Sequence, residues 1–136
     1  MINFRFFILA LIFLGCGTST KNSTCPECKM VIKKDKKEDT AYIKKVYFDD
    51  IGCMVLWTKE HNSNLDEVMV FTKDSKKYIK AKNAYYKIDE RTPMGYGFSA
   101  YQNSQIKSID FKEMRLRMLR GETMKNPKIR KQILGE

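Results

Sequence analysis

Two kinds of hydrophobic pattern follow each other in the first half of the chain. Residues 41–48 are rich in aromatic and β-branched side chains and predict a strand, and a shorter strand is expected at residues 30–32. Asp49 and Asp50 can cap a helix, which we predict over residues 51–60. The stripe of this helix that would face the core consists of Ile51, Met54, Val55 and Thr58.

Residues 67–72 contain a continuous apolar run at residues 68–71 and predict a buried strand, and a second series of elements follows it. Short strands are expected at residues 77–81, 84–88 and 97–102. Residues 84–88 could instead form a single helical turn. Asp110 and Glu113 have the spacing of a capping box and open a helix over residues 111–120, which Gly121 ends. Its inner stripe consists of Phe111, Met114 and Met118.

The repeated order of strand, helix and strand predicts a small single domain of the α+β class. We expect this domain to span residues 25–124. The basic tail at residues 125–136 is loosely held or forms one more turn of helix. A chain of this length can bury one modest core.

The first residues of the chain follow a different pattern. The segment up to Arg5 carries one positive charge, residues 6–14 form a continuous apolar run, and Gly15 precedes Cys16. This order is typical of a secretory signal peptide. The apolar run has about half of the roughly 20 residues that a membrane-spanning helix needs, so a retained transmembrane anchor is not expected.

The segment Phe13-Leu14-Gly15-Cys16 resembles a bacterial lipobox. This resemblance implies that residues 1–15 are removed, that Cys16 is acylated, and that residues 16–24 form a polar, lipidated tether. Gly17, where inner-membrane lipoproteins have Asp, implies sorting to the periplasmic side of the outer membrane. Retention in the inner membrane is the alternative.

The chain is strongly basic, with 26 Lys and Arg against 16 Asp and Glu and a formal net charge of +10. An exported protein has little access to nucleic acid, and the lysines are scattered and not interleaved with stacking aromatic residues. We therefore exclude nucleic acid as a partner. A solvated basic face is the simplest interpretation, and attraction to anionic headgroups or to an acidic partner is the alternative.

Acylation of Cys16 would leave three cysteines, Cys25, Cys28 and Cys53. A structural disulfide leaves one of them unexplained, whereas a metal site can use two or three. Cys25, Cys28 and Met30 place two thiols and a thioether within residues 25–30, and such soft ligands favour Cu(I). On an extended segment the Cys28 and Met30 side chains would share a face about 7 Å apart, so a turn must converge them on one ion.

Two other interpretations of the Cys25 and Cys28 pair stay open. A zinc site wants a second pair of ligands, and only Cys53 and His61 remain to supply it. A redox dithiol normally opens a helix after a strand, yet this pair follows the tether directly. Cys53 would lie in the first turn of the predicted helix, where the helix dipole favours a thiolate, although a buried inert cysteine is the alternative.

A methionine in the second half of the chain lies outside the predicted helices and strands. Met94 follows Pro93 and precedes Gly95, in a loop at residues 92–98. A thioether held on such a loop could close over a metal bound by Cys28 and Met30. Alternatively, Met94 only fills a gap in the core.

Several separate segments, in order, resemble the NosL family of copper-binding lipoproteins, which are accessory proteins of nitrous oxide reductase. Besides the lipobox Cys16, the matching segments are Cys28-x-Met30, Tyr47-Phe48-Asp49-Asp50-Ile51-Gly52-Cys53-Met54, Tyr78-Ile79-x-Ala81-x-x-Ala84-x-Tyr86 and Thr92-Pro93-Met94-Gly95-Tyr96-Gly97-Phe98. Lys29 replaces the glycine of the family's metal motif, and Cys25 is an additional thiol. The resemblance implies two ββαβ-like halves and Cu(I) binding through a cysteine and a methionine.

Together, these observations predict a membrane-tethered Cu(I) carrier that turns over no substrate. Its metal core would be Cys28 and Met30, with a third ligand from Cys25, Cys53 or Met94. The resemblance implies delivery to a periplasmic cuproenzyme, in the first place nitrous oxide reductase, or to its maturation transporter. The alternatives are a thiol-disulfide protein that uses Cys25 and Cys28, and a structural lipoprotein with incidental cysteines.

Overall fold

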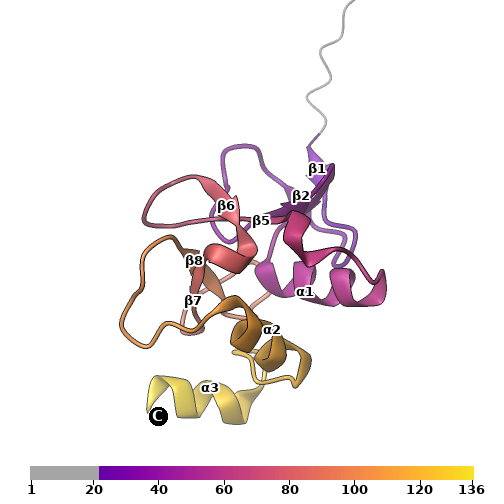
Figure 1. Cartoon of the computed structure of the whole chain (residues 1–136). Coiled ribbons are helices and arrows are strands. Elements are labelled where there is room, and N and C mark those ends of the chain that lie inside the picture. The colour runs from indigo at the N-terminus through magenta and orange to yellow at the C-terminus, as the bar shows by residue number, and fades with distance from the viewer. Residues whose placement is uncertain (1–21) are drawn as a thin grey trace, which may run out of the picture.

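A computed structural model of the chain describes residues 22–136 (Figure 1). The predicted signal peptide, the lipobox and the acylation of Cys16 lie outside the described residues. No helix within residues 22–136 combines the length and the apolar character needed to cross a membrane. The described chain begins at one end of the molecule and reaches its C-terminus at the opposite end.

A four-stranded antiparallel sheet forms the centre of the domain, with the strand order β4-β3-β5-β6. Its strands are β3 (Ala41–Ile43), β4 (Val46–Phe48), β5 (Val68–Phe71) and β6 (Tyr78–Lys80). The α1 helix (Ile51–Glu60) connects β4 to β5. The predicted helix over residues 51–60 and the buried strand within residues 67–72 are therefore confirmed.

The single strand predicted over residues 41–48 is wrong, because these residues form a hairpin. Ile43 pairs with Val46, which leaves Lys44 and Lys45 as the turn. Lys44 has a φ of 55°, a backbone conformation that Gly or Asn usually supplies in such turns. Neither Gly nor Asn occurs in this Lys44-Lys45 turn, so the sequence carried no signal for it.

The second half of the domain contains two further strands and two helices. They are β7 (Tyr85–Lys87), β8 (Ser99–Tyr101), α2 (Phe111–Leu119) and α3 (Pro127–Leu134). Short 3-10 helices are η1 (Leu65–Glu67) and η2 (Ala81–Asn83). β7 and β8 form an antiparallel pair, and a parallel bridge from Thr72 to Ala100 connects this pair to the end of β5.

The α+β fold class is confirmed. The first half has the order strand, strand, helix, strand in β3, β4, α1 and β5. The second half runs β7, β8 and α2, after which the described chain continues into α3 and not into a strand. The tail at residues 125–136 thus contains a helix, one of the two outcomes expected for it.

The core lies where α1 and α2 pack against each other and against the strands. The predicted inner stripe of α2 is buried, and Asp110 accepts a hydrogen bond from the Glu113 amide as expected for its cap. Phe48, Met54, Tyr86 and Phe98 are among the fully buried side chains that fill the space between the two halves. One compact core therefore links the N-terminal half to the loops of the second half.

The start of α1 is attached to the loop at residues 92–97 by a fully buried carboxylate. Asp50 caps α1 by accepting from the Gly52 amide (2.8 Å), as predicted. Its second oxygen accepts from the Thr92 hydroxyl (2.6 Å) and from the Met94 amide (2.9 Å). The Tyr96 ring packs directly on Gly52, where a Cβ would lie 2.3 Å from the ring.

This packing predicts that Gly52→Ala destabilises the domain although alanine favours helices. The added methyl group must displace the inner part of the Tyr96 side chain, and overpacking of this kind costs about 1–3 kcal/mol. Urea unfolding of Gly52→Ala should show this loss. The same substitution in a Tyr96→Ala background should be neutral or stabilising, and an equal loss in both backgrounds would contradict the contact.

Candidate metal centre

The first part of the site is a tight loop between β1 (Ser23–Thr24) and β2 (Val31–Ile32). Ser23 and Thr24, the last residues of the predicted tether, pair with Ile32 and Val31. The Cys25 amide donates to the Met30 carbonyl and the Lys29 amide donates to the Cys25 carbonyl, both at 2.9 Å. Lys29 allows this loop by adopting a φ of 66°.

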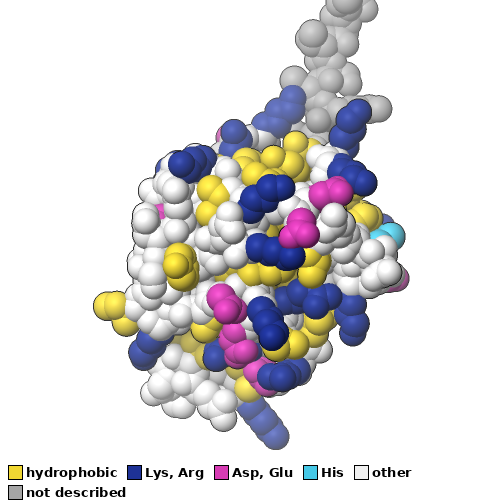
Figure 2. Space-filling model, in the orientation of Figure 1, with side chains coloured by type: hydrophobic (Ala, Val, Ile, Leu, Met, Phe, Trp, Pro, Cys, Tyr) yellow, Lys and Arg dark blue, Asp and Glu magenta, His cyan; other side chains and the backbone are white. Residues whose placement is uncertain are grey.

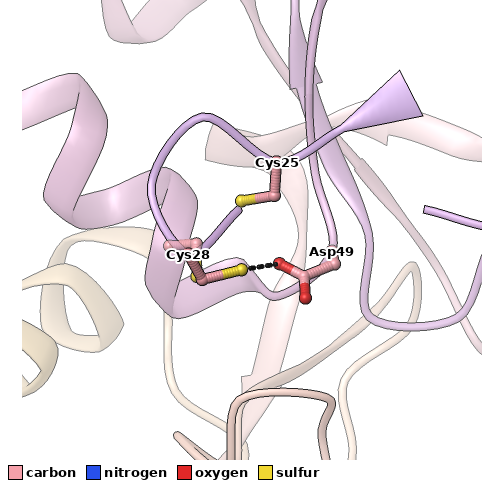
Figure 3. A group of neighbouring side chains, drawn as sticks. Cys25, Cys28 and Asp49 are labelled. Carbon is pink, nitrogen blue, oxygen red and sulfur yellow. Dashed lines mark hydrogen bonds between the residues drawn. The ribbon is translucent and has the colours of Figure 1, made fainter. Parts of the chain in front are cut away.

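The second part of the site is the junction between β4 and α1. Asp49 follows β4, Asp50 caps the helix, and Cys53 lies in the first helical turn, where it was predicted. Because Asp50 alone is used as the cap, the neighbouring Asp49 carboxylate is free to face the cysteine loop. Figure 3 shows Asp49 approaching Cys25 and Cys28 from this separate segment.

Four side chains meet between these two parts and could hold a metal ion. One ligand atom from each of Cys25, Cys28, Cys53 and Asp49 lies within 4.8 Å of all the others. Cys25 and Cys53 are fully buried, Asp49 is 5% exposed, and Cys28 is half-buried. The site is therefore closed on its inner side and open to the surface at Cys28.

The Asp49 carboxylate is only half satisfied by the protein. Its Oδ1 accepts a hydrogen bond from the Cys28 thiol at 3.0 Å, drawn as the dashed line in Figure 3. Its Oδ2 is buried and has no hydrogen-bond partner within the described part of the chain. A buried acceptor without a partner costs about 1–3 kcal/mol, and a bound cation would remove this cost.

The three thiols differ in how readily they lose their protons. Hydrogen bonding by the Cys53 thiol lowers the pKa of Cys25 to about 6. Burial, followed by hydrogen bonding to Asp49, raises the pKa of Cys28 to about 12. The interaction with Cys25 and burial raise the pKa of Cys53. Of the three thiols, Cys25 and not the helix-start Cys53 is therefore the one that loses its proton most readily, and a metal bound by all three would displace the protons of Cys28 and Cys53.

Met30 and Met94 lie outside this group of four side chains. Met30 is 48% exposed and lines a cavity that also borders Asp49. Met94 is half-buried against the core, in the loop that Asp50 holds beside the start of α1. Both remain candidate ligands from the sequence, and the described geometry places their segments next to the cluster.

The single histidine is placed away from the four-residue cluster. His61 follows the last residue of α1, at the end of the helix opposite to Cys53. Its ring stacks on Trp57 with centroids 3.9 Å apart, and Nδ1 lies 2.9 Å from the Trp57 carbonyl oxygen. His61, which the zinc interpretation of Cys25 and Cys28 would have used as a ligand, is therefore not part of the cluster.

Sequence reasoning identified the three cysteines but missed Asp49. Both aspartates were interpreted as helix caps, although one helix start uses a single capping side chain. The signal available was this surplus carboxylate, four residues before Cys53. Only the folded chain shows that it reaches the loop of Cys25 and Cys28.

Comparison of the chain with protein-family models, with curated proteins and with solved structures finds no match.

The cluster predicts that the reduced protein binds one Co(II) ion, used as a spectroscopic probe, with thiolate-to-metal charge-transfer absorption. Cys28→Ser and Cys53→Ser should each weaken this absorption, because each removes a ligand. Cys16→Ser is the matched control, since the lipobox resemblance assigns Cys16 to acylation and not to the metal site. Titration followed by absorption spectroscopy measures the effect, and a Cys53→Ser spectrum identical to the wild-type spectrum would contradict the site.

Proposed function

We propose that this protein is a Cu(I)-binding accessory protein that carries copper to a periplasmic cuproenzyme and catalyses no reaction itself. The observation that carries the proposal is the convergence of three thiols beside a buried, half-satisfied carboxylate. The resemblance to NosL makes nitrous oxide reductase, or its maturation transporter, the first candidate acceptor. The lipobox resemblance supports attachment to the periplasmic side of the outer membrane.

The donor set supports a soft ion. Thiolates select soft or borderline ions, Cu(I) and Zn(II) among them, and thioethers close to the thiolates favour Cu(I). Cys25, Cys28 and Cys53 supply three sulfur atoms, and the adjacent segments carry the thioethers of Met30 and Met94. Asp49 is a harder ligand, and we assign it to charge balance and to the hydrogen bond with Cys28.

The unequal burial of the cysteines suits transfer of an ion. Cys28 is accessible, whereas Cys25 and Cys53 are fully buried behind it. An incoming ion would meet Cys28 first and would then gain the two inner thiols. Release would follow the reverse order, so that a ligand of the acceptor replaces the outermost sulfur first. Met30, exposed at the same surface, can assist this exchange.

A thiol-disulfide function is the alternative, and one observation favours it. The pKa of Cys25, lowered to about 6, gives this thiol the thiolate character that redox motifs require. However, the nucleophile of such a motif must reach a substrate disulfide, and Cys25 is fully buried. The accessible thiol, Cys28, is the one whose pKa is raised. This arrangement favours storage of an ion over thiol exchange.

We expect Cys28→Ser and Cys53→Ser each to lower the Cu(I) affinity of the reduced protein by about 100-fold or more, equivalent to about 2.7 kcal/mol. Met30→Leu should have a smaller effect, because a thioether carries no charge. Cys16→Ser should leave the affinity unchanged. Competition with a chromophoric Cu(I) chelator measures these values, and an unchanged affinity of Cys28→Ser would refute the proposal.

The redox alternative leads to a separate prediction. With Cys25 buried, the wild-type protein should show no catalytic reduction of a small disulfide substrate in the presence of a reductant. The measurement is turnover relative to the uncatalysed reaction. Turnover that disappears in Cys25→Ser and in Cys28→Ser but persists in Cys53→Ser would replace the carrier function by a dithiol function.

A further inference from the structure

A cavity of about 610 Å³ adjoins the metal centre and is not used by the ligands proposed above. The chain from Met30 to Thr40 forms most of its lining, and Asp49, Arg91 and Pro93 complete it. Asp49 belongs to both the cavity and the cysteine cluster. A group bound in the cavity would therefore lie directly beside the ion.

The rim of this cavity carries positive charge that the described protein does not neutralise. Lys33, Lys36, Lys37 and Arg91 line the cavity, are exposed, and form no salt bridge with any carboxylate of residues 22–136.

By contrast, two carboxylates of the cavity lining are paired with lysines outside it. Glu38 binds Lys76 at 2.8 Å and Asp39 lies 3.6 Å from Lys73. Asp35 at the rim and the buried Asp49 are then the acidic side chains of the lining without a lysine partner among residues 22–136. The free charge of the rim is therefore predominantly positive.

The cavity also offers exposed apolar surface next to this charge. Met30 is 48% exposed and Val31 is 57% exposed, and both line the cavity together with Ile32 and Pro93. Figure 2 shows hydrophobic side chains between lysine and arginine side chains at the end of the molecule where the described chain begins. Apolar surface surrounded by polar groups is typical of a protein interaction site.

We infer that this cavity docks an acidic segment, with at least one apolar side chain, of the protein that exchanges copper with this site. The inference rests on the proposed carrier function. Acidic side chains of the segment would pair with the rim lysines and Arg91, and its apolar side chain would cover Met30 and Val31. The segment's own metal ligand would then reach Cys28 past Asp49.

The shape of the surface favours a protein segment over a lipid surface. Anionic headgroups would also attract these lysines, but a flat bilayer cannot enter a concave cavity. A segment of chain can, and it brings its ligand to the ion. Because the attraction is electrostatic, it would act mainly on the rate of encounter and would weaken as salt rises.

Two synthetic peptides test the inference. Both carry one Met-x-x-Met unit and one Phe. In the acidic peptide these residues are flanked by Asp and Glu, and in the neutral peptide they are flanked by Asn and Gln. At low salt the labelled, metal-free acidic peptide should bind the protein, measured by fluorescence anisotropy, and the neutral peptide should not. Loaded with Cu(I), the acidic peptide should transfer its ion about ten-fold faster than the neutral peptide, and salt should remove this difference.

Charge reversal at the rim provides the decisive variant, Lys33→Glu with Lys36→Glu and Lys37→Glu. This triple variant should lose peptide binding and the faster transfer while keeping the equilibrium Cu(I) affinity. The matched control reverses the same number of exposed charges on α3, at the opposite end of the molecule, with Lys128→Glu, Arg130→Glu and Lys131→Glu. This control should behave as the wild type.

Three other outcomes would each overturn the inference. Equal loss in the rim and α3 variants would mean that net charge, and not the cavity, attracts the peptide. Equal behaviour of the acidic and neutral peptides would mean that the cavity recognises no acidic segment. If the rim variant no longer bound phosphatidylglycerol vesicles but still bound the acidic peptide as the wild type does, the rim would be assigned to a membrane. Failure of Cu(I) binding alone would refute the carrier function but leave the metal-free peptide result standing.

Discussion

The buried carboxylate of Asp50 is the constraint on which the rest of the site depends. It caps α1 through the Gly52 amide, and it holds the loop of the second half through the Thr92 hydroxyl and the Met94 amide. Burial raises the pKa of this carboxyl group, and the three hydrogen bonds counteract that effect. Since Asp50 fixes the start of α1, the side chains on either side of it, Asp49 and Cys53, are fixed as well. The candidate metal centre thus adjoins a helix start whose capping carboxylate is already satisfied.

Burial of the donor atoms prepares the site for an ion. Three sulfur atoms and a carboxylate lie within 4.8 Å of one another without a disulfide among Cys25, Cys28 and Cys53, and one carboxylate oxygen lacks a partner. A protein interior normally pairs its buried polar groups, so an unpaired carboxylate oxygen in a cluster of metal-ligand types is consistent with a bound ion. The same burial explains the order of access, with Cys28 outside and the other thiols inside. In the docking that we propose, the exposed basic cavity beside Asp49 would let a partner approach this outer thiol.

The sequence predicted the elements whose signals are local. Asp50, the stripe of α1 and the capping box at Asp110 were identified because helix starts and helical periodicity depend on neighbouring residues. The turn at Lys44 was missed because a lysine occupies a position that usually takes Gly or Asn. Asp49 was missed for a different reason: its role depends on contact with a loop about 20 residues earlier, and that contact follows from the packing of β1 and β2. The proximity of Cys53 to Cys25 and Cys28 is likewise a tertiary contact, which residue spacing alone does not determine.

Coordination of copper by Cys25, Cys28 and Cys53 is tested most directly by X-ray absorption spectroscopy of the protein loaded with one equivalent of Cu(I), compared with Cys53→Ser. This coordination predicts a first shell of three sulfur atoms in the wild type and a changed shell, with one sulfur fewer or a replaced ligand, in the variant. Identical spectra for the two proteins, or a shell dominated by nitrogen and oxygen, would contradict the assignment of Cys25, Cys28 and Cys53 as the copper ligands.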